Sequence, residues 1–224
     1  MKKYVNETEE LFVQVQYDDW AESPREWSNL WTILTWSGYN SIDENPYYDF
    51  EEFLSDNLTE KQIANLYKGE PSTKEFFDKV KKRFYNLGYL VAPISKYKHG
   101  QVSYSAGVSN GWDARVVGIA MVNINDIKKE YKTTVLSKDL KEKIHAILDS
   151  ELDTYNLWAN GYVYNVSLVS FDGGYVDCLG GMIGYENEEK MIQEYINNYT
   201  DYNFEDFKVK ELQERKISRY SVED

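Results

Sequence analysis

The stretch that decides the fold runs from Ser137 to Ile183 and reads SKDLKEKIHAILDSELDTYNLWANGYVYNVSLVSFDGGYVDCLGGMI. Apolar residues recur at helical spacing through its first half, which predicts a helix over 137–160 that ends at Gly161. Two strand-like runs follow at 162–171 and 175–183, and the Asp-Gly-Gly turn between them predicts a β-hairpin. The apolar stripe of the helix consists of Leu140, Ile144, Ile147, Leu148, Leu152 and Tyr155. A long helix followed by a β-hairpin indicates an α+β fold, with a mostly antiparallel sheet and packed helices.

The rest of the chain supplies further helices and strands, without an internal repeat or a Pro/Ser-rich linker. Alternating apolar residues predict strands, and apolar residues at helical spacing predict helices. The expected strands cover 11–16, 90–95, 101–106 and 116–122, and the expected helices cover 49–58, 59–66, 72–88, 125–131 and 186–199. We expect 1–224 to form a single domain, with an acidic helical lobe within 1–88 as the alternative. Weak periodicity over 208–224 indicates a segment that frays.

The segment Ser23-Pro24-Arg25-Glu26 has the features of a helix start. The Ser23 side chain can accept a hydrogen bond from the amide of Glu26, and Pro24 suits the first helical position. We therefore expect a short helix after this segment. Its inner face would carry Trp27, Leu30 and Trp31.

Charge is distributed unevenly along the chain. The net charge is −13, and residues 1–60 carry 14 acidic side chains against three basic ones, a net charge of −11. Neither Lys nor Arg occurs between Arg25 and Lys61, whereas 61–100 carries nine basic side chains against three acidic ones. Four of the six tryptophans lie in the first 60 residues. An acidic surface repels nucleic acid and attracts basic proteins, so this distribution favours a protein partner.

The acidic N-terminal quarter, residues 1–60, supplies the candidate partner-binding residues. Carboxylates held on a folded scaffold can occupy the positions of phosphates, so such a protein competes with DNA for a basic groove. Trp20 or Trp36 would serve as an apolar anchor, and core packing is the alternative role of these tryptophans. The candidate contact carboxylates are Asp18, Asp19, Asp43, Glu44, Glu51, Glu52 and Asp56.

The sequence contains no decisive catalytic or cofactor-binding motif. Its two histidines, His99 and His145, lie far apart and lack the spacing of zinc ligands. Cys178 is the single cysteine, which excludes an intrachain disulfide and fits a reducing cytoplasm. Gly180-Gly181 follows a strand and precedes an acidic helix, so we interpret it as a bulge or turn and not as a phosphate-binding loop. We therefore expect a non-enzymatic protein with no metal and no cofactor.

Two other functions stay open. Adjacent carboxylates, Asp18-Asp19 and Glu51-Glu52, could support acid–base chemistry in a metal-dependent enzyme. Alternatively, the basic face of the helix at 72–88 could bind nucleic acid, with tyrosines nearby for stacking. The residues of this face are Lys79, Lys81, Lys82 and Arg83. The overall acidity favours instead a solvated face, or one that pairs with the acidic quarter, so direct nucleic-acid binding is not our leading expectation.

Three separated segments resemble a poorly characterised protein family carried by phages, plasmids and conjugative elements. They are SPREWSNL at 23–30, WDARVVG at 112–118 and ELDTYNLWANGYVY at 151–164, and the resemblance spans about residues 10–185. The chain departs from the family at Ala114-Arg115, where smaller or polar residues are expected, and it lacks a Cys-Pro pair before Trp112. The resemblance implies no catalytic residues. It implies an accessory gene of a mobile element, and such genes often counter the restriction or CRISPR nucleases of the host.

These observations together lead to one expected function. No apolar stretch approaches the roughly 18 residues that span a membrane, and the N-terminus lacks a signal-peptide apolar region. We expect a cytoplasmic protein of a bacterial host that acts as a DNA mimic and inhibits a defence nuclease. Its partner would be a basic, nucleic-acid-binding host protein. At Trp112-Asp113 we expect a turn anchor, with Asp113 capping the turn through its side chain, in preference to a functional loop.

Overall fold

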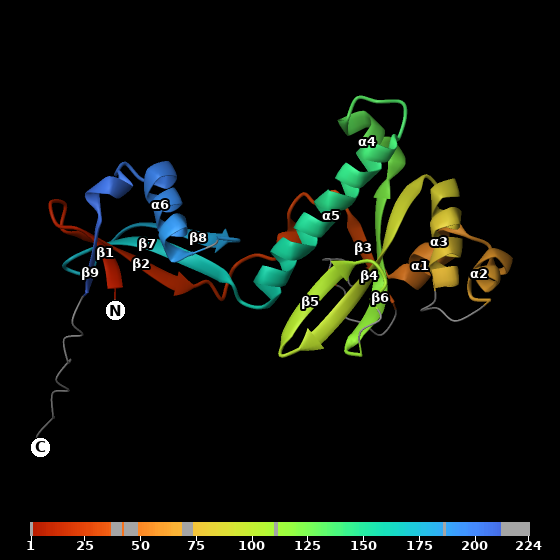
Figure 1. Ribbon diagram of the computed structural model, residues 1–224, viewed down its shortest axis with the longest axis horizontal. Helices are drawn as coiled ribbons and strands as arrows, with labels where there is room; N and C mark the ends of the chain where they lie inside the picture. The colour runs from red at the N-terminus through yellow and green to blue at the C-terminus, as the bar shows by residue number, and fades with distance from the viewer. Residues whose placement is uncertain are drawn as a thin grey trace, which may run out of the picture. The chain divides into compact units, whose positions relative to one another are not determined.

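The computed structural model describes residues 2–36, 42, 49–68, 74–109, 112–185 and 187–211 (Figure 1). These residues form six α-helices and two antiparallel sheets, which confirms the predicted α+β class. The predicted long helix is α5 (Lys138–Ala159), and it is followed by the predicted hairpin of β7 (Val163–Ser170) and β8 (Tyr175–Ile183). Local periodicity was therefore sufficient to define this part of the fold.

The chain divides into two compact units. The first, here called the terminal unit, combines Met1–Ala21 with Gly161–Asp224, and the second, the inserted unit, comprises Glu22–Asn160. The sequence predicted a single domain, and no change in composition marks either point at which the chain passes between the units. The terminal unit needs strands from both ends of the chain, so it forms only through contacts between residues that are far apart in sequence.

The terminal unit is a five-stranded antiparallel sheet with one helix packed on it. The strand order is β8-β7-β2-β1-β9, with β1 (Lys2–Asn6), β2 (Leu11–Tyr17) and β9 (Lys208–Glu211). β9 pairs with β1, so the beginning of the segment expected to fray is a strand. Helix α6 (Glu188–Tyr199) covers one face, and the short 3-10 helix η2 (Phe204–Asp206) follows it. The core between sheet and helix includes Leu11, Val13, Val166, Leu168, Met182, Met191, Ile192, Tyr195 and Ile196.

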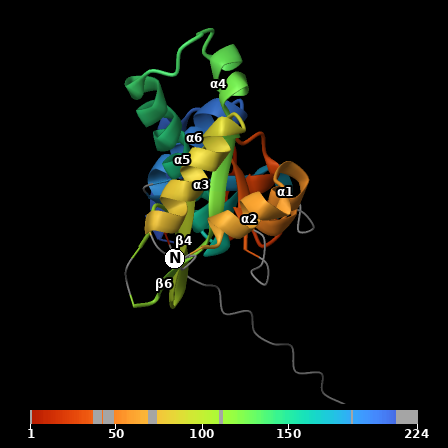
Figure 2. The same cartoon turned by 90° about the vertical axis from the view of Figure 1, so that its right-hand side faces the viewer.

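The inserted unit consists of three layers. Its sheet has the order β3-β6-β4-β5, with β3 (Thr32–Thr35), β4 (Tyr89–His99), β5 (Gln101–Ala106) and β6 (Ala114–Asn123). Helices α4 (Ile124–Glu130) and α5 lie on one side of the sheet. Helices α1 (Phe50–Asn57), α2 (Glu60–Leu66) and α3 (Lys74–Asn86) lie on the other (Figures 1 and 2). The sheet is buried on both faces, which explains the nearly continuous apolar run of β6.

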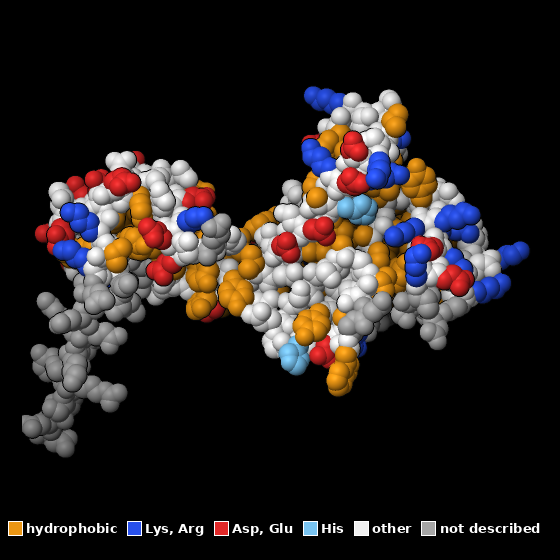
Figure 3. Space-filling view, viewed as in Figure 1, with side chains coloured by type: hydrophobic (Ala, Val, Ile, Leu, Met, Phe, Trp, Pro, Cys, Tyr) orange, Lys and Arg blue, Asp and Glu red, His pale blue; other side chains and the backbone are white. Residues whose placement is uncertain are grey.

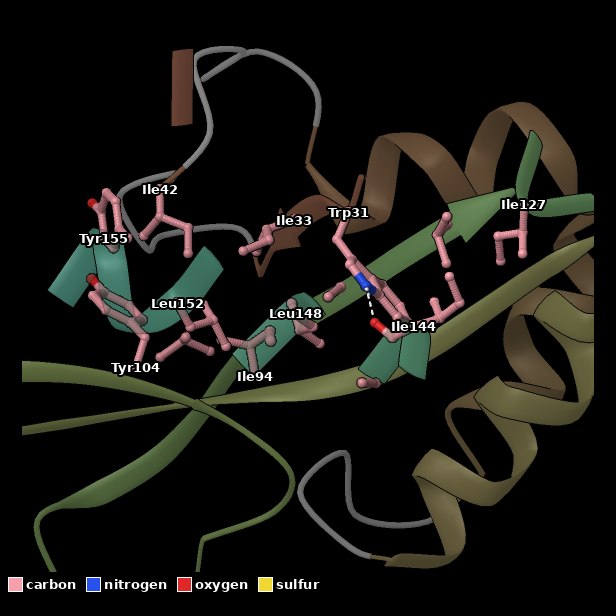
Figure 4. Packing of buried hydrophobic residues seen from close by; sticks show 14 residues of the cluster. Trp31, Ile33, Ile42, Ile94, Tyr104, Ile127, Ile144, Leu148, Leu152 and Tyr155 are labelled. Atoms are coloured by element: carbon pink, nitrogen blue, oxygen red, sulfur yellow. Dashed lines mark hydrogen bonds between the residues drawn. The ribbon is translucent and has the colours of Figure 1, made fainter. Parts of the chain in front are cut away.

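Most predicted apolar faces in the inserted unit are confirmed. On α5, Ile144, Leu148 and Leu152 are buried against the sheet (Figure 4). The indole of Trp31 is 1% exposed in the same cluster, and its Nε1 donates to the carbonyl oxygen of Ile144 at 2.9 Å. Aromatic residues dominate the opposite cluster, which contains Phe50, Phe53, Phe76, Phe77 and Phe84.

The helix expected after Ser23 is shortened to a single 3-10 turn, η1 (Pro24–Glu26). Ser23 does act as a cap, but its Oγ accepts from the amide of Arg25 at 3.2 Å and not from Glu26. Trp31 then lies in extended chain that leads directly into β3, a strand that the sequence did not indicate. The helix expected over 125–131 also begins slightly earlier, because α4 starts at Ile124 with Asn123 as its cap. Long-range contacts of Arg25 and Trp31 with α5 decide the first of these boundaries, whereas a local cap sets the second.

Candidate partner-binding surface

The predicted contact residues belong to two different units. Asp18, Asp19 and Trp20 belong to the terminal unit, whereas Trp36 and the acidic residues of α1 belong to the inserted unit. Asp43 and Glu44 lie outside the described residues.

The net charge is concentrated in the terminal unit. Its two segments carry 8 basic and 18 acidic side chains, a net charge of −10. The inserted unit carries 17 basic and 20 acidic side chains, a net charge of −3. In Figure 3, acidic side chains predominate over the terminal unit, whereas basic side chains gather over α3 and α4 of the inserted unit. The sequence suggested an acidic surface made by residues 1–60, whereas most of the net negative charge belongs to the terminal unit, residues 1–21 and 161–224.

The Trp20 loop, residues 18–20, presents an exposed tryptophan beside two carboxylates. The Trp20 side chain is 95% exposed. Asp18 organises the loop, because its Oδ1 accepts from the amide of Trp20 at 3.2 Å and its Oδ2 accepts from the amide of Gly181 at 2.9 Å. A Cβ at Gly180 would lie 2.7 Å from Asp18 Oδ2, so glycine there leaves room for the carboxylate. Asp19 is exposed.

The two glycines that receive Asp18 confirm the interpretation of Gly180-Gly181 as a bulge. The register between β7 and β8 shifts at this point, and Gly181 has a φ of +70°, which favours glycine. The same bulge places the amide of Gly181 where the Asp18 carboxylate can accept from it. The bulge therefore fixes the base of the Trp20 loop.

Tyrosines extend the aromatic surface next to the Trp20 loop. Tyr17 is 66% exposed, and its ring stacks on Tyr164 with ring centroids 5.3 Å apart. These two tyrosines, together with Tyr4 and Glu188, line a hollow of about 670 Å³ in the terminal unit. Lys3 also lines the hollow, although its ammonium lies 3.9 Å from the centroid of a neighbouring aromatic ring, that of Phe12. Tyrosine rings beside a carboxylate suit the side chain of Arg or Lys from a partner.

A second group of acidic and aromatic residues lies at the other end of β2, where sequence reasoning did not place a site. The amide of Phe171 donates to the carbonyl oxygen of Glu10 at 2.8 Å, which joins the β1–β2 turn to the β7–β8 turn. Phe171 and Tyr175 are 53% and 66% exposed. Asp172 accepts from Ser170 Oγ and from the amide of Gly174, and these hydrogen bonds lower its pKa. The feature of the sequence that could have indicated this group is the Asp172-Gly173-Gly174 turn, which Phe171 and Tyr175 flank.

The acidic residues of α1 differ in their surroundings. Glu52 and Asp56 are exposed, but Glu51 is half-buried and accepts a hydrogen bond from Tyr67. Burial, the charge of Glu51 and this hydrogen bond together raise the pKa of Tyr67 to about 12. Glu51 therefore links α1 to the end of α2, in addition to any contact with a partner.

Trp36 packs inside the inserted unit. Its ring centroid lies 4.3 Å from that of Phe50 in an edge-on arrangement, and it also contacts Phe76 and Phe77. The core alternative considered for the tryptophans accounts for this position. Trp20 is consequently the better placed of the two candidate anchors.

The basic residues of α3 are divided between two sides of the helix. Lys79 Nζ lies 2.8 Å from Glu75 Oε1 and donates to the carbonyl oxygen of Lys68 at 2.7 Å. Lys79, Lys82 and Arg83 line a hollow of about 320 Å³ together with polar residues of α2. Lys81 lies on another side, where burial and the charge of Lys81 lower the pKa of His145. The four basic residues thus do not form one continuous face.

All three segments that resemble a mobile-element family contain residues with structural roles. Arg25 is 6% exposed, and its Nη1 donates to Glu151 Oε2 at 3.0 Å, which joins the first segment to the third. In the second segment, Gly118 faces β3 so closely that a Cβ would lie 2.2 Å from the carbonyl oxygen of Leu34. Trp112, also in the second segment, is fully exposed, so the expectation that it anchors a turn is wrong.

Among the described residues, no group of three or more His, Cys, Asp or Glu side chains is arranged to hold a metal ion. Cys178 is exposed, and its Sγ lies 3.1 Å from Asn165 Oδ1. Among the described helices, none combines the length and apolar character required to cross a bilayer. Comparison with protein-family models, with curated proteins and with solved structures finds no match to this chain.

Proposed function

We propose that this protein is a non-enzymatic inhibitor that binds a basic protein through the terminal unit. The observation that carries the proposal is the net charge of −10 on this unit together with the 95% exposure of Trp20 beside Asp18 and Asp19. The partner is a nucleic-acid-binding protein, and a host defence nuclease of the CRISPR or restriction type fits the mobile-element setting that the sequence resemblance implies.

Charge explains the choice of partner. The terminal unit carries 18 acidic side chains against 8 basic ones, and this excess creates a negative potential that repels phosphates and attracts grooves lined by Lys and Arg. Such a potential mainly accelerates association, so the complex should weaken as salt increases. A protein that occupies the basic groove excludes nucleic acid from it, which is inhibition without chemistry.

The Trp20 loop supplies specificity that charge alone lacks. Exposed tryptophans are enriched among the residues that dominate binding energy in interfaces. The Asp18 carboxylate accepts hydrogen bonds from the amides of Trp20 and Gly181, and these bonds hold the loop in one conformation before binding, which reduces the entropy lost in the complex. The hollow beside Tyr17 and Tyr164 can accept a basic side chain of the partner next to this anchor.

The proposal is tested by capture and competition. The purified chain serves as bait in a bacterial lysate treated with nuclease, at low and high salt, and the captured protein is then assayed for binding of labelled DNA. We expect a basic protein that is released at high salt and that loses its DNA when the chain is added. Replacement of Trp20 by Ala should weaken the complex by at least roughly 10-fold, and Asp19→Lys should slow its association.

A charge reversal on α1 is the matched control. Glu52→Lys combined with Asp56→Lys changes two exposed carboxylates of the inserted unit and leaves the terminal unit intact. If this variant loses the partner while Trp20→Ala keeps it, the binding surface is α1 and the assignment to the terminal unit is wrong. If the captured protein keeps its DNA in the presence of the chain, competition with nucleic acid is excluded.

A further inference from the structure

A second candidate site, basic where the terminal unit is acidic, lies in the inserted unit where β6 begins beside the end of β4. Its central feature is Trp112, whose side chain is fully exposed two residues before β6 begins. Such exposure is unusual for tryptophan, which is mostly buried in folded proteins. In Figure 3, the end of the β4–β5 hairpin shows a histidine grouped with acidic and hydrophobic side chains. The indole of Trp112 is therefore available to a ligand.

Three basic side chains lie on the sheet beside Trp112. Lys96 and Arg115 are directly opposite each other in the antiparallel pair of β4 and β6. Lys98 follows Lys96 by two residues, so both point to the same face, roughly 7 Å apart along the strand. These three side chains and Trp112 line a hollow of about 660 Å³, together with Asp113 and Ala114.

The described residues that line the hollow include three basic side chains and one acidic one, so their net charge is positive. The acidic one is Asp113, whose Oδ2 lies 3.3 Å from Nδ1 of His99, which is not among these lining residues. Lys96 extends over the ring of Tyr104, with its ammonium 5.2 Å from the ring centroid, which holds it on this face of the sheet. Tyr97, by strand alternation, projects from the opposite face.

We propose that this hollow, defined by Trp112, Lys96, Lys98 and Arg115, binds a short segment of single-stranded nucleic acid. An unpaired base can stack on the exposed indole, and consecutive phosphates can contact cations spaced along a strand. A duplex keeps its bases paired and stacked, so it cannot offer a base face to Trp112. The site goes beyond the proposed function, since it lies in the inserted unit and takes a ligand of opposite charge.

The test measures binding of a short fluorescein-labelled oligothymidylate to the full-length chain by fluorescence anisotropy over a series of salt concentrations. Trp112→Ala should weaken binding by roughly 5- to 100-fold, the range for loss of one stacked base. Lys98→Ala combined with Arg115→Ala should reduce the slope of log affinity against log salt by about 1.4, because two phosphate contacts are lost. Thermal unfolding should be unchanged in Trp112→Ala, since the side chain is exposed.

Two controls distinguish this site from others. Tyr97→Ala removes an exposed aromatic side chain from the other face of the same strand, and it should leave the affinity unchanged. Lys82→Ala combined with Arg83→Ala removes two basic side chains of α3 and should also leave the affinity unchanged.

Several results would overturn the proposal. They are an absence of oligothymidylate binding by the unmodified chain, equal binding by Trp112→Ala, and loss of binding in the α3 variant alone. Equal competition by thymidine monophosphate would show a mononucleotide site, and equal competition by polyglutamate would show anion attraction without stacking. Equal affinity for duplex DNA would contradict recognition of an unpaired base.

Discussion

At the scale of residues, the contacts of Arg25 hold a segment in an irregular conformation where local sequence predicted a helix. Its Nη1 donates to Glu151 on α5, and its Nη2 donates to the carbonyl oxygen of Trp31 at 2.5 Å. The other oxygen of Glu151 accepts from the amide of Leu30 at 2.7 Å. One buried ion pair thus satisfies the backbone of a segment that has no regular secondary structure. The helix predicted for this segment would have removed these contacts.

The ion pair leads to a prediction for stability. Arg25→Ala leaves the Glu151 carboxylate without its cation in a nearly buried position, where the two side chains are 2% and 12% exposed. We expect a loss of about 3–5 kcal/mol in the free energy of unfolding, the usual cost of breaking a buried pair from one side. Urea denaturation measures it.

A charge-neutral control separates the ion pair from the backbone contact. Glu151→Gln keeps an acceptor for the amide of Leu30 and removes the negative charge. We expect a smaller loss of stability than for Arg25→Ala. Equal stability of Arg25→Ala and the unmodified chain would show that the pair contributes nothing measurable.

At the scale of elements, α5 protects the outer edge of the inserted unit's sheet. β5 is an edge strand, and its free backbone groups could otherwise pair with another chain. Asn156 accepts from the amide of Tyr104 at 2.7 Å and donates to its carbonyl oxygen at 2.9 Å. Asn160 makes the same two bonds with Val102, at 2.9 and 2.7 Å. Asn156 and Asn160 are four residues apart on the helix, and Tyr104 and Val102 are two residues apart on the strand. These two distances are similar, so both asparagines reach their partners.

Removal of one amide should expose one position of the edge strand. Asn156→Ala eliminates two hydrogen bonds, so we expect a loss of about 1–3 kcal/mol in the free energy of unfolding. Hydrogen exchange should accelerate at the amide of Tyr104, while the amide of Val102 stays protected by Asn160. Asp153→Ala, an exposed change on the same helix, serves as the control. Uniform acceleration along β5 would contradict the pairwise clamp.

At the scale of the whole molecule, the inserted unit lies in the sequence between two paired strands of the terminal unit. β2 ends at Tyr17 and its neighbour β7 begins at Val163, and the whole inserted unit lies between them in sequence. The insertion separates two charge distributions, −10 in the terminal unit and −3 in the inserted unit. Acidic and basic surfaces can therefore serve different ligands within one chain.

The inserted unit should fold by itself. Glu22–Asn160 contains both layers of helices and the complete four-stranded sheet between them, so its two hydrophobic clusters need no residue from the terminal unit. We expect a fragment of these residues to unfold cooperatively on heating, as followed by circular dichroism. A gradual loss of signal without a transition would show that the terminal unit is required for its stability.

The sequence by itself determined those helices and strands in which apolar residues recur at the spacing of a helix or a strand. The stripe of α5, the helices α1 and α3, and the strand β6 were predicted because their apolar residues repeat within a few positions. The turn residues of the β7–β8 hairpin were equally local signals. Such patterns state which side of an element is buried, but they do not state what covers it.

Tertiary structure alone decided the partners of these elements and the position of the charge. β1, β3 and β9 are too short to show a period, and each becomes a strand because a neighbouring strand satisfies its backbone. Fourteen acidic residues lie within residues 1–60, yet the chain passes from the terminal unit to the inserted unit after Ala21, which divides them. Trp36 became a packing residue and Trp112 an exposed one for the same reason, since burial depends on contacts between residues far apart in the sequence.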